Sequence, residues 1–224
     1  IQEDVKYALR KFKKRPVAFA KDVGLLGPRT TLAHAVWMTD HDIATLSKTR
    51  TNVAHCPSSN TKLSSGIARI PEMLDRGVNV ALGCDGGPSN NSYDMIREMK
   101  LAACMHKVRL SDPMTMPAKR VLEMATIRGA RAVGMEDRLG SLEPGKLADI
   151  VLVNLDSVHM VPNNNCVSDL VYAGCGHEVD TVIIDGRIAM EHRKLTTLDE
   201  PEIIHEARER ARALLERTGL KPET

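Results

Sequence analysis

The chain has 224 residues, enough for one large domain or two smaller ones, with 42% hydrophobic and 27% charged residues. A net charge of +2 and an aromatic content of 3% argue against a nucleic-acid-binding protein, and no apolar run is long enough to cross a membrane. The five cysteines, an odd number without a C-x-x-C pair, favour a reducing compartment, so we expect a cytoplasmic protein.

The first part of the chain alternates predicted helices and strands. This alternation predicts a parallel sheet with helical crossovers, which is typical of an α/β fold. Thr39 and Asp42 form the pattern of a capping box before one of the helices. The predicted elements in chain order are helices at 1–12 and 16–23, a strand at 30–37, a helix after Thr39, a strand at 52–56, a loop at 58–62, a helix through Pro71 and Leu74 that ends at Gly77, a strand at 78–84, cap-forming residues at 89–92, and helices at 93–107 and 117–133.

Three of the predicted strands carry a polar residue at or near the carboxyl end, namely His34, His55 and Asp85. The carboxyl ends of parallel strands meet at one edge of a sheet or one mouth of a barrel, where functional residues are placed. Asp85 is followed by Gly86 and Gly87, which permit a close approach of the backbone to a ligand. The alternative is that Asp85 only begins a turn and caps the next helix. For His55 we favour a packing role over direct contact with a metal.

After Gly134 the pattern changes to short strands. Residues 139–142 and 148–153 are predicted strands about the turn at 143–146, and 179–184 and 187–190 are predicted to form a hairpin through Asp185-Gly186. Residues 202–217 predict a charged amphipathic helix. We therefore expect a domain boundary near residue 138 and an antiparallel module after it.

Four sequence motifs together carry a resemblance to a known family. They are LAHAVW at residues 32–37, AHCPSSN at 54–60, LGCDG at 82–86, and LEPGKLADIV at 142–151. The chain resembles the amidohydrolase superfamily along nearly its whole length. Within it, the chain is most similar to the branch that holds methylthioadenosine/S-adenosylhomocysteine deaminases, guanine deaminases and triazine hydrolases.

The resemblance implies the C-terminal portion of a (β/α)₈ TIM barrel followed by part of a small β-sandwich. Residues 1–138 would then carry barrel strands 6–8, 139–197 the β-sandwich module, and 198–224 a helix that packs back on the barrel. Family members bind one divalent metal, zinc first and iron as the alternative. Asp85 matches the metal-binding aspartate of the eighth strand and His34 the histidine of the sixth.

The same resemblance implies a metal-dependent hydrolytic deaminase of an amino-substituted purine, nucleoside or related N-heterocycle, acting through a metal-activated water. Asp85 would be both metal ligand and base, and His34 would hold the attacking water and stabilise developing charge. His34, Asp85 and His55 are the candidate contacts to the small-molecule substrate. One alternative is a triazine-type hydrolase that expels chloride or an alkylamine, and another is a non-catalytic half that needs a partner chain.

The chain departs from the family pattern in one respect. It contains no His-x-His pair and no His-x-x-Glu motif, which supply the remaining metal ligands and an acid in the family. We therefore expect these residues to be the C-terminal half of a longer polypeptide, with the N-terminal half of the same protein as its partner. The family resemblance also implies a homo-oligomer.

Overall fold

The computed structural model describes residues 2–220, and Ile1 and residues 221–224 lie outside this description. The chain divides into two compact units. One comprises Ile1–Leu147 and Asn154–Glu178, and the other Ala148–Val153 and Val179–Thr224. Each unit has its own β-sheet. Among the described residues, no helix combines the length and the apolar character that a membrane crossing requires.

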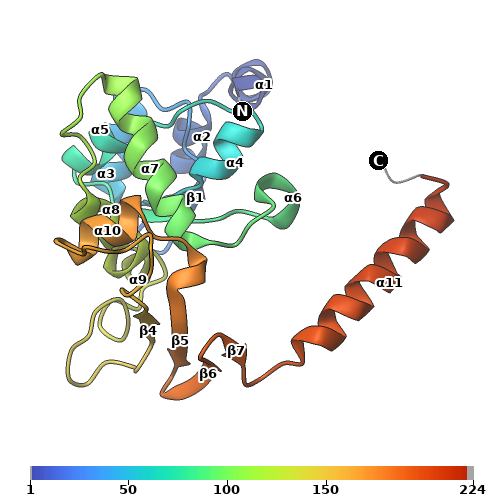
Figure 1. The fold of residues 1–224 in the computed structure, drawn as a ribbon. Coiled ribbons are helices and arrows are strands. Elements are labelled where there is room, and N and C mark those ends of the chain that lie inside the picture. The colour runs from blue at the N-terminus through green and yellow to red at the C-terminus, as the bar shows by residue number, and fades with distance from the viewer. Residues whose placement is uncertain (1, 221–224) are drawn as a thin grey trace. The chain divides into compact units, whose positions relative to one another are not determined.

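The first unit is built on a parallel three-stranded sheet in the order β1-β2-β3, so the predicted parallel sheet is confirmed. Figure 1 labels the first strand, β1, and helices of this unit. Helices connect the strands, as right-handed crossovers require. Its elements are α1 (Gln2–Phe12), α2 (Pro16–Asp22), β1 (Thr31–Ala33), α3 (Asp40–Thr49), β2 (Asn52–His55), α4 (Pro57–Lys62), α5 (Ile70–Asp75), β3 (Val80–Leu82), α6 (Gly87–Asn90), α7 (Met95–Leu110), α8 (Ala118–Ala125), α9 (Ile127–Ala132), α10 (Cys166–Tyr172) and the 3₁₀ turn η1 (Gly176–Glu178).

Burial differs sharply between the strands of this sheet. All of β3 is buried, and Val53 in β2 is completely enclosed. In β1, by contrast, Thr31 and Ala33 are exposed and Leu32 is half-buried. Strands of parallel sheets are normally covered on both faces. In the part of the chain that the structure describes, β1 therefore lacks the cover that its neighbours have.

Helix α3 begins at the capping box expected from the sequence. The Asp42 backbone N–H donates to the Thr39 hydroxyl at 3.2 Å, and the Thr39 backbone N–H donates to the Asp42 carboxylate at 2.9 Å. Arg15 donates to the same carboxylate at 2.7 Å, because Asp42 is buried and requires a charged partner.

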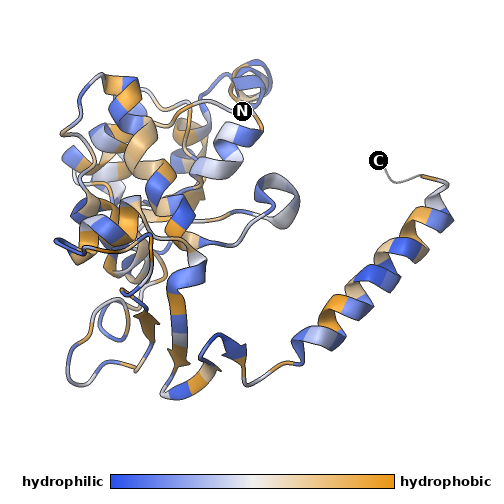
Figure 2. Cartoon of the chain, viewed as in Figure 1, coloured by the Kyte–Doolittle hydropathy of each residue, from blue (hydrophilic) through white to orange (hydrophobic). Residues whose placement is uncertain are grey.

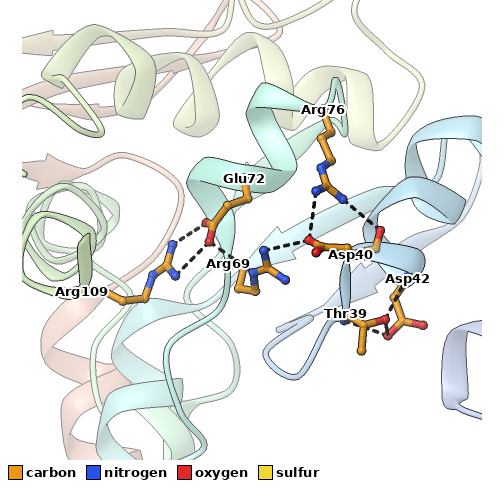
Figure 3. Close-up of polar contacts among 7 residues, drawn as sticks. All are labelled: Thr39, Asp40, Asp42, Arg69, Glu72, Arg76 and Arg109. Carbon is orange, nitrogen blue, oxygen red and sulfur yellow. Dashed lines mark hydrogen bonds and ion pairs between the residues drawn. The ribbon is translucent and has the colours of Figure 1, made fainter.

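A network of charged residues joins α3, α5 and α7 (Figure 3). Arg109 of α7 donates both terminal nitrogens to Glu72, one of them at 3.0 Å. Arg69 connects Glu72 to Asp40, with contacts of 3.2 Å and 3.0 Å. Arg76 donates to the Asp40 side chain and backbone, both at 3.0 Å. Shared partners of this kind hold the helices in register better than isolated surface pairs do.

Several predicted elements need correction. The predicted loop at 58–62 belongs to helix α4, which Pro57 begins at its first position. The helix expected at 117–133 is broken at Thr126, whose hydroxyl donates to the Leu122 carbonyl at 2.7 Å and competes with the helical pattern. Asp94, rather than the polar run at 89–92, caps α7. No strand forms at 139–142. The Lys146 ammonium instead donates to the backbone carbonyls of Glu136 and Leu139.

The second unit contains a four-stranded antiparallel sheet, in the order β4-β5-β6-β7, and a long helix. The predicted hairpin is confirmed: Asp185 and Gly186 both have positive φ, as a two-residue turn between twisted strands requires. Hydrophobic and hydrophilic residues alternate along α11 (Figure 2). The elements are β4 (Ile150–Val153), β5 (Val179–Ile184), β6 (Arg187–Glu191), β7 (Lys194–Leu195) and α11 (Glu200–Thr218).

The expected domain boundaries remain predictions. The first unit continues past residue 138 to Leu147 and includes Asn154–Glu178, which lie within the range predicted for the module. The second unit has one sheet among the described residues, so a second sandwich layer is not confirmed. Helix α11 contains no buried residue, and its packing on a barrel also stays a prediction.

Candidate active site

His34 and Asp85, predicted from two separate strands, lie together in the structure. His34 follows β1 directly, and Asp85 comes three residues after the end of β3. The His34 Nε2 atom is 3.9 Å from Asp85 Oδ2. Both residues line a cavity of about 700 Å³, together with Trp37, Ser59 and Ser89. The expected convergence of these two strand ends is confirmed.

The Asp85 carboxylate is held by hydrogen bonds that favour its charged form. The Ser59 hydroxyl, on the first turns of α4, donates to Asp85 Oδ2 at 2.6 Å. This hydrogen bond is the main cause that lowers the pKa of Asp85, and the Gly86 backbone N–H adds to it. A carboxylate that stays ionised can bind a cation or accept a proton from water.

The His34 ring is held from its other side. Its Nδ1 atom lies 2.9 Å from the Asn60 side-chain oxygen, and Asn60 is buried. His34 and Asp85 both have left-handed backbones, with φ of +65° and +63°. Non-glycine residues adopt this conformation at a cost, and such residues cluster at functional sites.

Glu98 is a buried residue that sequence reasoning did not identify. It extends from α7 to accept hydrogen bonds from the Ser58 backbone N–H at 3.1 Å and from the Asn90 amide at 2.8 Å. Asn90 also donates to the Cys84 carbonyl at 2.7 Å. This one carboxylate therefore ties the segment after β2 to the segment after β3, which carries Asp85. Asn90, through these two hydrogen bonds, organises the loop after β3.

His55 is not brought into the cavity. Its side chain is completely buried, and its Nε2 atom lies 3.3 Å from His106 Nε2 on α7. Burial is the main cause that lowers the pKa of His55, and the neighbouring His106 lowers it further. Burial likewise lowers the pKa of His106 to about 4. This placement favours the packing role for His55 over contact with a metal or substrate.

The neighbouring cysteine also behaves as a core residue. Cys56 is buried, and burial raises the pKa of its thiol to about 11, with Asp85 adding to the effect. The neutral thiol is a poor nucleophile and a poor metal ligand. Cys56 therefore acts as a small core side chain.

The side chains present fit part of a metal site. An ionised carboxylate oxygen and an imidazole nitrogen are both donors that zinc accepts, and zinc sites in enzymes use three protein ligands or more. Within residues 2–220, no group of three histidine, cysteine or acidic side chains is arranged to hold a metal ion. Asp85, with His34 beside it, would thus hold a metal only together with ligands from elsewhere.

Comparison with known proteins identifies deaminases among the relatives of this chain. The chain is 45% identical over 208 residues to a 5-methylthioadenosine/S-adenosylhomocysteine deaminase of Syntrophomonas wolfei, covering 92% of this chain and 48% of the relative. It is also 45% identical over 203 residues to a 5'-deoxyadenosine deaminase of Methanothermobacter thermautotrophicus, covering 91% and 47%. The chain therefore spans about half the length of the curated relatives it matches.

The chain is also similar to solved structures of zinc-bound enzymes. The chain superimposes on a zinc-bound adenosine deaminase from Xanthomonas campestris with a TM-score of 0.91 at 35% identity, covering 94% of this chain and 48% of that one. A zinc-bound atrazine chlorohydrolase from Arthrobacter aurescens gives a TM-score of 0.86 at 27% identity, covering 91% and 45%. Residues 1–189 match the amidohydrolase family, so the resemblance read from the motifs is confirmed. The chain belongs to the amidohydrolase family.

Proposed function

We propose that this chain supplies the Asp85–His34 part of the active site of a metal-dependent hydrolytic deaminase. The substrate class that its relatives favour is an adenosine derivative altered at the 5' position. The observation that carries the proposal is the meeting of His34 and Asp85, 51 residues apart in sequence (85 − 34), at 3.9 Å in one cavity. The net charge and the amino-acid composition of the chain do not help here, because they would be the same if His34 and Asp85 formed only a structural ion pair.

Each residue has a role that its environment supports. A bound divalent cation supplies a Lewis acid and lowers the pKa of a coordinated water. Asp85, kept ionised by Ser59, would ligate that cation through its carboxylate and accept the proton of the attacking water. His34, with Nε2 toward Asp85, would orient the attacking water. The proton held by Asp85 would then pass to the departing amine.

A complementary polypeptide is part of this proposal. The chain spans about half of its relatives, and its described residues offer too few ligands for zinc. Among the described residues, the exposed strand β1 lies at the edge of the sheet and pairs with another strand on one side only. A further strand from the rest of a (β/α)₈ barrel would cover that edge. We therefore place the remaining metal ligands on that polypeptide, either as part of the same protein or as a separate chain.

The test is ammonia release from 5'-methylthioadenosine and 5'-deoxyadenosine by the zinc-loaded protein. The chain is assayed by itself and after mixing with the N-terminal half of the Syntrophomonas relative. Activity and stoichiometric zinc are expected in the mixture. Asp85→Ala and His34→Ala are each expected to reduce turnover at least ~10²-fold. His41→Ala, a change of an exposed histidine on α3, serves as the matched control and should retain activity.

Each outcome bears on the proposal. Full turnover in either site variant would contradict the assigned roles. Chloride release from a chlorotriazine, with no ammonia from any adenosine derivative, would favour the triazine hydrolase alternative. Zinc binding and barrel assembly without either product would indicate a non-catalytic half and overturn the proposed activity.

A further inference from the structure

The Asn60 side chain makes a hydrogen bond with one ring nitrogen of His34. Asn60 is 1% exposed, and its Oδ1 atom is 2.9 Å from His34 Nδ1. With the amide oxygen of Asn60 toward the ring, Asn60 can only accept in this contact, and the hydrogen of the bond is then on Nδ1. The lone pair of the neutral ring is then on Nε2, the atom that faces Asp85 across the cavity.

The position of Asn60 is fixed by the backbone on both sides of it. Its own N–H donates to the Cys56 carbonyl at 3.0 Å, and its carbonyl accepts from the Ser65 N–H at 2.8 Å. Glu98 holds the Ser58 N–H at the start of the same helix. The amide oxygen is therefore presented to His34 by a short helix that is anchored at its beginning and end.

We propose that Asn60 is a positioning residue that holds neutral His34 in its Nδ1–H form, so that the Nε2 lone pair is presented to the attacking water. This inference rests on the proposed function for its consequence in turnover. The opposite form would place an N–H on Nε2, pointing toward the Asp85 carboxylate. That ring would donate to Asp85 and could not accept a hydrogen bond from water.

The tautomer can be measured without substrate or metal. Protein labelled with ¹⁵N-histidine is examined at alkaline pH, where the rings are neutral, and the His34 signals are assigned by their loss in His34→Gln. The expected pattern is a protonated Nδ1 and an unprotonated Nε2. Asn60→Leu, similar in size but without an acceptor, should shift His34 toward Nε2–H, and Asn60→Asp, which keeps an acceptor, should retain Nδ1–H.

A matched control changes the same helix without touching His34. Thr61 donates its hydroxyl to the Pro57 carbonyl at 2.8 Å, and Thr61→Val removes that bond alone. This variant should leave the His34 pattern unchanged. In active protein, Asn60→Leu should lower kcat ~10-fold to ~100-fold with KM within about twofold, as loss of a partner that orients an active-site imidazole does.

The result that overturns this proposal differs from the one that overturns the proposed function. A wild-type His34 protonated on Nε2, or an Asn60→Leu spectrum identical to wild type, refutes the role of Asn60 even if ammonia is released. Because the wild-type spectrum is decisive by itself, failure of a variant to fold does not leave the question open. Conversely, an Nδ1–H ring in a zinc-loaded mixture of the two halves without deaminase activity would support the positioning and refute the activity.

Discussion

Acidification should destabilise the first unit through the buried pair His55 and His106. Both side chains are fully buried, and their Nε2 atoms are 3.3 Å apart. At this distance one hydrogen can lie between the two nitrogens, which requires at least one of the two rings to be neutral. Neither Nδ1 atom has a hydrogen-bond partner within residues 2–220. A positive charge placed there would be poorly solvated, so the folded state resists protonation at these rings.

The direction and size of the effect follow from the lowered pKa values. Because the folded pKa of His106 is about 4 and the unfolded value is 6.5, the unfolded chain binds more protons between these limits. Stability is therefore fully present above pH 6.5 and is lost as the pH falls toward 4. The loss from His106 alone is about 2 kcal/mol at pH 5 and roughly 3 kcal/mol at pH 4. His55, whose pKa is also lowered, adds in the same direction.

Urea unfolding at pH 7.5, 6 and 5 measures this dependence, with the fluorescence of Trp37 as the probe. Trp37 is the sole tryptophan of the chain and lies in the first unit. His106→Gln replaces the titratable ring by an amide of similar length, and its stability should fall by about 2 kcal/mol less than that of wild type between pH 7.5 and 5. His41→Gln, at an exposed site, should follow wild type. Parallel curves for wild type and His106→Gln would refute the reasoning.

Three further predictions concern the supports of the site and its metal. Glu98→Ala leaves the Ser58 N–H without its acceptor and removes one of the two acceptors of the Asn90 amide, and we expect a loss of about 2–5 kcal/mol in urea unfolding, whereas Glu98→Gln should lose less. Glu72→Gln weakens the half-buried pair with Arg109, and we expect the unfolding free energy to fall by about 1–3 kcal/mol, measured at low salt. Dialysis of zinc-loaded, active protein against a chelator should abolish ammonia release, and added zinc should restore it; activity that survives complete zinc removal would contradict metal dependence.

The positions of His34 and Asp85 could be predicted because each follows an apolar strand that the sequence marks clearly. The side-chain direction of His55 could not. β1 and β2 pair as Ala33↔Ala54, so simple alternation would place His34 and His55 on the same side of the sheet. The strand instead ends at Ala33, and His34 adopts a left-handed backbone that redirects its side chain. His55 keeps the strand geometry and faces α7, where it meets His106.

The supports of the site were harder to predict, for a different reason. Glu98 lies on a helix whose periodicity indicates only amphipathic packing, and its partners are 40 and 8 residues away in sequence. Local sequence patterns do not predict these hydrogen bonds, because the bonds depend on how α7 lies against α4 and α6. A buried acid within an otherwise ordinary helix could have been noticed as a charge on the apolar face, yet its partners required the structure.

The left-handed backbones at His34 and Asp85 connect these observations. Each costs of order 1–3 kcal/mol relative to an extended residue, and neither position uses glycine to avoid the cost. Ser59 and Asn60, adjacent on α4, offset part of it by holding one side chain each. A pair of strained residues, one held by the Ser59 hydroxyl and the other by the Asn60 amide, is more than an ion pair requires. It is what a site needs if the two side chains must keep a fixed separation before a cation and a water arrive.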